Sequence, residues 1–129
     1  MVLPDTSVWV SFFRAPSGAE GDRLETLIAE GGAAICGPVL AELLAGAEER
    51  QRTAIAETVG GLPWADLDRS CWRDVGALAR RLRQAGQMLP LTDLAIAVAA
   101  ARAGYALWSL DSDFKRIVPA LDALELYRA

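Results

Sequence analysis

The sequence predicts an α/β protein, a three-layer α/β/α sandwich with a mostly parallel central sheet. Short apolar runs alternate along the chain with stretches of helical period, and glycines or prolines separate them. The chain has 129 residues, of which 53% are hydrophobic and 23% charged, without a repeat or linker. A chain of this length buries roughly two-thirds of the surface that it exposes when unfolded, so we expect a single domain over residues 1–129.

The chain begins with a predicted strand followed by two helices. Residues 1–5 form an apolar run that ends in a carboxylate, and Thr6 or Ser7 then caps a helix that continues to Phe13. An amphipathic surface helix is expected over residues 20–30, because its leucines recur on one face and two glycines follow it.

The middle of the chain predicts two short strands around a pair of helices. Residues 33–36 are a brief apolar run bounded by glycines, which indicates a buried strand. Pro38 suits the first turn of the next helix, and another helix is expected over residues 49–58. Residues 62–67 predict a strand at the edge of the sheet, since Pro63 has no N–H to donate.

Two long helices and a strand complete the pattern. Residues 68–87 show apolar side chains at helical spacing, and residues 92–103 are apolar on nearly every face, which predicts a helix buried between other elements. Gly104 ends this second helix, and residues 105–110 predict a strand that leads into Asp111.

Composition restricts the chemistry that is possible. With 13 basic and 17 acidic side chains the formal charge is −4, which disfavours a broad basic surface for nucleic acid. The chain has no histidine, so carboxylates must carry any acid–base or metal chemistry. We expect Cys36 and Cys71 as buried free thiols. We also expect the tryptophans in the core, with stacking on nucleic-acid bases as the alternative: Trp9, Trp64, Trp72 and Trp108.

The start of the chain does not predict export or a membrane anchor. Residues 1–13 contain too short an apolar run to span a bilayer, and they lack the basic start and cleavage site of a secretory signal. The expectation is a cytoplasmic protein without membrane contact.

Four carboxylates stand where a site is expected. Asp5 and Asp111 follow the first and fourth predicted strands, at the sheet edge where open parallel sheets bind ligands. Glu42 and Asp93 lie in otherwise apolar helices, where a buried carboxylate needs a partner or a metal. Each has an ordinary alternative role, as a helix cap, first-turn residue, turn residue or solvated side chain. The four together favour a common site.

These segments resemble the four acidic blocks of PIN domains, in the order and at the spacing of that family. The resemblance covers essentially the whole chain and is strongest to the small VapC-type ribonuclease toxins of bacterial toxin–antitoxin pairs. The residues that carry it are 3–10, 39–43, 91–97 and 107–114.

The resemblance implies a metal centre and a catalytic site. Asp5, Glu42, Asp93 and Asp111 would gather at the carboxyl edge of the sheet and bind Mg²⁺ or Mn²⁺. The donor set agrees, because carboxylates without His or Cys select hard cations over zinc. Supporting roles fall to the hydroxyls and the carboxylate at three neighbouring family positions: Ser7, Ser109 and Asp113. Asp111 is preferred as the direct ligand, although Asp113 follows in the same turn.

The resemblance further implies the reaction and the substrate. Without imidazole, cleavage of a phosphodiester would use metal-activated water, and the family implies RNA as the substrate of an endoribonuclease. Basic side chains near the acidic blocks are candidates for phosphate contacts, with a solvated helix face as the alternative. They are Arg80, Arg81, Arg83, Lys115 and Arg116.

The resemblance also implies two protein partners. One is a VapB-type antitoxin whose segment would fill a groove and present a basic side chain to the acidic site, and the other is a second copy in a homodimer. Residues 8–13 and 39–44 are apolar enough to face a partner, although core packing explains them equally well.

Three other functions compete with that of an RNA-cleaving toxin. A flap or structure-specific DNA nuclease is disfavoured because the chain has no insertion that could thread a strand. A phosphatase with an aspartyl nucleophile would need a second Asp at position 7, which is Ser7. A non-catalytic RNA-binding module is disfavoured because all four carboxylates are present.

Overall fold

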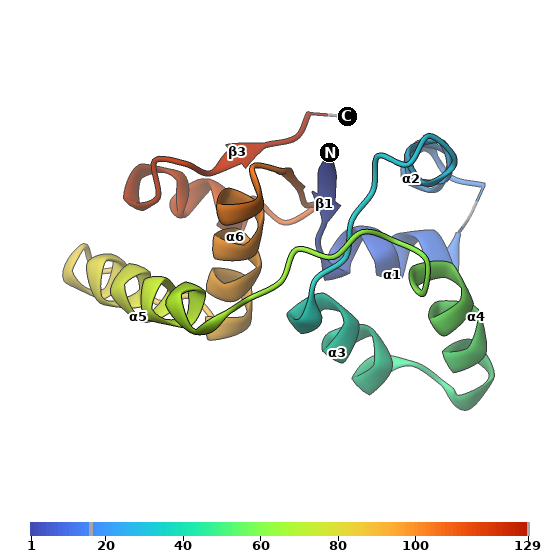
Figure 1. Cartoon of the computed structure of the whole chain (residues 1–129), viewed down its shortest axis with the longest axis horizontal. Helices are drawn as coiled ribbons and strands as arrows, with labels where there is room; N and C mark the ends of the chain where they lie inside the picture. The colour runs from blue at the N-terminus through green and yellow to red at the C-terminus, as the bar shows by residue number, and fades with distance from the viewer. Residues whose placement is uncertain (16, 129) are drawn as a thin grey trace.

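A parallel β-sheet forms the centre of the computed structural model, which describes residues 1–15 and 17–128 (Figure 1). Its strands are β1 (Val2–Pro4), β2 (Ala106–Trp108) and β3 (Glu125–Leu126), in the order β1-β2-β3. Both pairings are parallel, with Leu3 opposite Leu107 in the first. Together with the surrounding helices, this sheet confirms the predicted α/β class.

Two predicted strands are reduced to single parallel bridges. Ala33 pairs with Val2, and Trp64 pairs with Ile35, so these segments continue the sheet beyond β1 without forming full strands. The predicted strands are longer than the observed pairing, because backbone pairing extends only one residue on either side of each bridge. The predictions also missed β3, a two-residue strand with one exposed side chain and no apolar run to indicate it.

The described part of the chain contains six α-helices, close to where periodicity predicts them. They are α1 (Thr6–Arg14), α2 (Ala19–Ala29), α3 (Gly37–Gly46), α4 (Glu49–Val59), α5 (Arg69–Gln84) and α6 (Leu91–Ala103). Two short 3₁₀ helices, η1 (Ser112–Arg116) and η2 (Val118–Ala120), connect β2 to β3. Asp5 caps the first helix, which is the alternative role expected for it, whereas Thr6 and Ser7, the other expected caps, lie in the first turn.

The helices enclose the sheet from both sides. In Figure 1, α5 and α6 lie on one side of β1 and helices α1 to α4 on the other. As its composition predicts, α6 is buried along its length, from Leu94 to Ala100, and Gly104 ends it with a positive φ of 73°. Cys36 and Cys71 are free and buried, as expected.

The tryptophan prediction is right for only two residues of four. Trp9 and Trp108 are buried in the core. Trp64 and Trp72 are 43% and 51% exposed, because they lie at a bridge and on the outer face of α5, where nothing in the described chain covers them. Exposed tryptophans at two neighbouring elements indicate a surface that another molecule covers.

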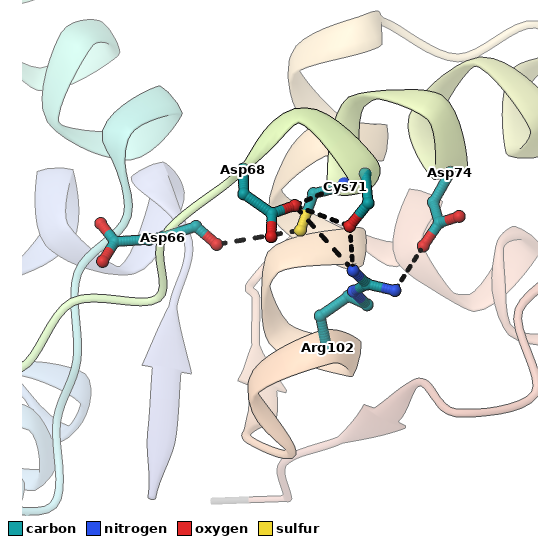
Figure 2. Close-up of polar contacts among 6 residues, drawn as sticks. Asp66, Asp68, Cys71, Asp74 and Arg102 are labelled. Carbon is teal, nitrogen blue, oxygen red and sulfur yellow. Dashed lines mark hydrogen bonds and ion pairs between the residues drawn. The ribbon is translucent and has the colours of Figure 1, made fainter.

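A polar cluster joins the start of α5 to α6 (Figure 2). Arg102 of α6 lies 3.2 Å from Asp74 and 3.9 Å from Asp68, and it also donates to the Ser70 hydroxyl. Asp68 caps α5 by accepting from the Cys71 N–H at 2.9 Å. These contacts join the start of α5 to α6, and α6 carries Asp93.

No helix among the described residues is long and apolar enough to cross a membrane.

Candidate active site

Asp5 is the buried centre of the candidate site. It directly follows β1, its N–H donates to the Trp108 carbonyl at 2.8 Å, and only 4% of the residue is exposed. Its Oδ1 caps α1 by accepting from the Val8 N–H at 3.2 Å. Burial raises the pKa of Asp5, and the hydrogen bonds that it accepts oppose this rise.

Two serine hydroxyls orient the Asp5 carboxylate. Ser7 Oγ donates to Oδ1 and Ser109 Oγ donates to Oδ2, each at 2.5 Å. Each hydroxyl also accepts from the loop after β2: Ser7 Oγ from the Leu110 N–H at 3.0 Å, and Ser109 Oγ from the Asp111 N–H at 2.9 Å. The two serines named from the sequence therefore link the ends of β1 and β2 through Asp5.

Asp93, on the first turn of α6, faces the other acidic side chains. Its pKa is raised to about 6, first by partial burial and then by the negative charges of Glu42, Asp111, Asp5 and Asp113, in that order. The charges of the other three predicted carboxylates therefore all act on Asp93, more weakly than its burial does.

Asp111 and Asp113 differ in how they are engaged. Asp111 caps η1, and its Oδ1 accepts from the Asp113 N–H at 2.9 Å. Asp113 is paired with Arg116, with 3.3 Å between Oδ1 and Nη1. Arg116 also donates from Nε to the Gln87 side chain at 2.7 Å. The pairing neutralises Asp113 in part, which favours Asp111 as the direct ligand.

Glu42 stands on the exposed face of α3 and is tied to α1. Thr6 Oγ1 donates to Glu42 Oε1 at 2.6 Å. The sequence predicted Thr6 only as a possible cap, so this positioning contact was missed. Its place directly after Asp5, in the first turn of a helix, was the signal that could have indicated it.

The predicted basic residues separate into two groups. Arg80, Arg81 and Arg83 are exposed on α5, and they form no ion pair with an acidic site residue and line none of the pockets that contain one. Lys115 is exposed and lines a pocket with Ser109 and Asp111. Of the five predicted cations, Lys115 is the one that the structure leaves available beside the site.

The donor set fits a hard divalent cation in chemistry. The site offers only carboxylate and hydroxyl oxygens. Burial first, and then the neighbouring negative charges, raise the pKa of Asp93, and a cation would relieve the part that is due to charge. In the described residues, however, no three carboxylates are already close enough to enclose one ion. Binding one ion through several of these carboxylates would therefore require their side chains to move closer together.

The fold and the acidic edge together define a class of protein. A parallel sheet flanked by helices, with carboxylates collected at the carboxyl ends of β1 and β2, is an α/β protein with its site at the sheet edge. The chain belongs to the PIN domain family, whose sequence profile matches residues 2–118.

Named relatives lie within this family. A VapC ribonuclease of Mycobacterium bovis is 34% identical over 119 residues, which cover 88% of this chain and 89% of the relative. Among solved structures, VapBC2 of Rickettsia felis bound to a promoter DNA fragment has a TM-score of 0.80 and 25% identity, covering 98% of each chain. VapBC-5 of Mycobacterium tuberculosis, from the VapBC family of toxin–antitoxin systems, has a TM-score of 0.68 and 25% identity, covering 98% of this chain and 97% of its own.

Proposed function

We propose that the chain is the endoribonuclease toxin of a VapBC-type pair, and that it hydrolyses RNA phosphodiesters with Mg²⁺ or Mn²⁺. The observation that carries the proposal is the buried Asp5 carboxylate, held by Ser7 and Ser109 where β1 and β2 end. The pKa of Asp93, raised by burial and then by the charges of the other carboxylates, supports it. The names of the relatives support RNA as the substrate. RNA is in the cytosol, so this is where we expect the chain to act.

In the proposed reaction the acidic residues hold the ion, and Asp5 and Asp93 contribute in different ways. The ion, when bound by Asp5, Asp93, Asp111 and Glu42, would supply the Lewis acidity that phosphodiester hydrolysis requires. Asp5 is held in one orientation by its two serine hydroxyls, so it provides a fixed reference for the site. Asp93 would bind the ion as a carboxylate, and the cation would counter the burial and the negative charges that raise its pKa to about 6 in the metal-free chain.

Cleavage of total cellular RNA tests the proposal. The purified chain, free of antitoxin, is incubated with Mg²⁺ or Mn²⁺, with EDTA, and as the Asp5→Asn variant. We expect discrete fragments with either metal, and a loss of rate on the order of 10²-fold or more in the variant. The matched control is Asp122→Asn, an exposed carboxylate outside the site, which should cleave normally. Intact RNA under every condition, from folded protein, contradicts the proposal.

The antitoxin is expected in a groove between α1, α3 and α4. This groove has a volume of about 210 Å³ and includes Val10, Phe13 and Leu43 among its lining residues. Glu42 also lines it, so a bound segment would reach the acidic site with a basic side chain. Of the apolar stretches predicted to face a partner, Val8 and Val39 are fully buried and belong to the core.

A second copy of the chain is expected on a different surface, the apolar groove between α3 and the start of α6. The groove has a volume of about 740 Å³, and its lining includes Trp64, Trp72 and Leu91, which are 43%, 51% and 63% exposed. Its charged lining residues are the carboxylates Glu42 and Asp66, and no cation lines it among the described residues. Within the described chain the groove thus offers no cation to an RNA phosphate, whereas its apolar lining suits an apolar face of another chain.

A further inference from the structure

A second pocket opens beside the acidic site, on the β3 side of the sheet. It has a volume of about 610 Å³, and its lining includes Ser109 and Asp111, which both belong to the acidic site. The size is that of small-molecule sites in proteins. Because it shares two residues with the acidic site, anything bound in it lies next to the reacting phosphate.

The floor of this pocket is apolar and its aromatic wall is fixed. The apolar lining residues are Leu107, Phe114, Val118 and Leu126. The Tyr127 ring packs against Trp108, with 5.4 Å between ring centroids, and Arg23 lies 5.6 Å from the Tyr127 centroid. Arg23 Nε also donates to Tyr127 Oη at 2.5 Å. The wall is therefore pre-organised, which lowers the entropic cost of binding a planar group.

Two cations stand at the rim of the same pocket. Lys115 and Arg128 are both exposed, and neither forms an ion pair with a carboxylate of residues 1–15 or 17–128. The neighbouring Arg116, by contrast, is already paired with Asp113. The chain as a whole has a net charge of −4 and would repel RNA. These two cations beside the proposed cleavage site would attract the RNA phosphates locally.

We propose that this pocket binds the nucleotide that adjoins the scissile phosphate of the RNA strand. The inference rests on the proposed function, since it names a substrate contact of the same site. The base lies on the apolar floor against Tyr127, and Lys115 and Arg128 contact the backbone phosphates. Arg128 and Tyr127 thereby become substrate-positioning residues that no sequence pattern indicated.

The test compares two double variants that each remove two cations. Lys115→Ala with Arg128→Ala empties the pocket rim, whereas Arg50→Ala with Arg52→Ala removes the same charge from α4, away from both pocket and acidic site. Cleavage is measured in the natural background with Mg²⁺. Binding of a fluorescein-labelled single-stranded RNA of mixed sequence is measured in the Asp5→Asn background, so that the RNA stays intact, over a series of salt concentrations.

The rim variant should raise both Kd and KM by roughly tenfold. It should also make the dependence of log Kd on log salt shallower by about 1.4, since each phosphate that is no longer neutralised accounts for about 0.7. A conservative Lys115→Arg with Arg128→Lys variant should restore the slope. Equal Kd, KM and slope in the rim and α4 variants would contradict RNA binding in this pocket, without contradicting the proposed nuclease activity. If the unaltered chain does not cleave RNA, the proposed function fails instead.

Discussion

The Asp5 carboxylate shows how one residue serves two purposes. Its Oδ1 is a helix cap, which the sequence offered as an ordinary alternative, and it also lies at the centre of the acidic site. Both are possible because Ser7 and Ser109 supply donors for a carboxylate that is almost fully buried. A buried charge without such donors would cost several kcal/mol, on the order of the stability of a domain.

Removing the Ser109 hydroxyl should therefore destabilise the protein. Ser109→Ala leaves Asp5 Oδ2 without its donor at 2.5 Å, at a cost of about 1–3 kcal/mol of unfolding free energy at pH 7. The hydroxyl favours the ionised form, so the loss should shrink as the pH falls and Asp5 becomes protonated. Urea denaturation at several pH values measures this. Ser109→Thr keeps the hydroxyl and is the control; equal losses in both variants would contradict the argument.

Replacing Asp93, in contrast to Ser109, should stabilise the metal-free protein. The pKa of Asp93 rises from 3.8 to about 6 on folding, so its ionisation disfavours the folded state. The folded protein is relieved of this penalty below pH 4 and carries it in full above pH 6. Asp93→Asn in EDTA should then raise the Tm by a few degrees at pH 7.5, and the gain should disappear near pH 4.

Excess metal should reduce or reverse the difference in Tm between Asp93→Asn and the natural chain. Excess Mg²⁺ is expected to raise the Tm of the natural chain more than that of Asp93→Asn, because the variant has lost one ligand. Asp122→Asn, outside the site, controls for the removal of a negative charge. A clear drop in the Tm of Asp93→Asn at pH 7.5 in EDTA would show that the carboxylates do not face one another.

At the scale of elements, helices were predictable and strands only partly so. The apolar run at Leu94–Ala100 is unambiguous because a helix needs only local hydrogen bonds. Ala33 and Trp64 form single bridges, and β3 has two residues, because strand pairing depends on partners far along the chain. Asp5, Glu42 and Asp93 stood out as carboxylates in apolar surroundings. Tyr127 did not, since its contacts join segments that no local pattern connects, and the place of Thr6 beside Asp5 did not by itself indicate that it would contact Glu42.

The junction of α5 with α6 is where an element-scale prediction can be tested (Figure 2). The pKa of Asp68 falls to about 2, first through the Cys71 N–H and then through the Ser70 hydroxyl, with Arg102 contributing less. Its contribution to stability is present above pH 4 and is lost as the pH falls towards 2. Asp68→Ala should lower the Tm by a few degrees at pH 7, and this difference should be smaller near pH 2.5.

Asp68→Asn separates the cap from the charge. Asparagine still accepts from the Cys71 N–H, so this variant should retain most of the Tm that alanine loses. Thermal unfolding followed by circular dichroism gives both values. If asparagine and alanine lower the Tm equally, the ion pairs of Arg102, and not the helix cap, stabilise the junction.

At the scale of the whole molecule, three surfaces have separate occupants. The rim cations Lys115 and Arg128 suit RNA, and the groove between α1, α3 and α4 suits an antitoxin segment. The apolar groove with its two exposed tryptophans is left for the second copy. Glu42 lines the groove on either side of α3, so occupation of either groove acts directly on one member of the acidic site.

The oligomeric state tests this division of surfaces. Light scattering on the purified chain should give twice the chain mass of 13.8 kDa. Trp72→Glu with Leu91→Glu places charges in the apolar groove and should give a folded monomer, because a charge buried at an interface without a partner is costly. Met88→Glu is the matched control, since Met88 is 75% exposed and does not line the groove. A natural chain that is monomeric, or a charged variant that is still dimeric, would contradict dimerisation through this groove. Trp64 and Trp72 would then be expected to contact another partner.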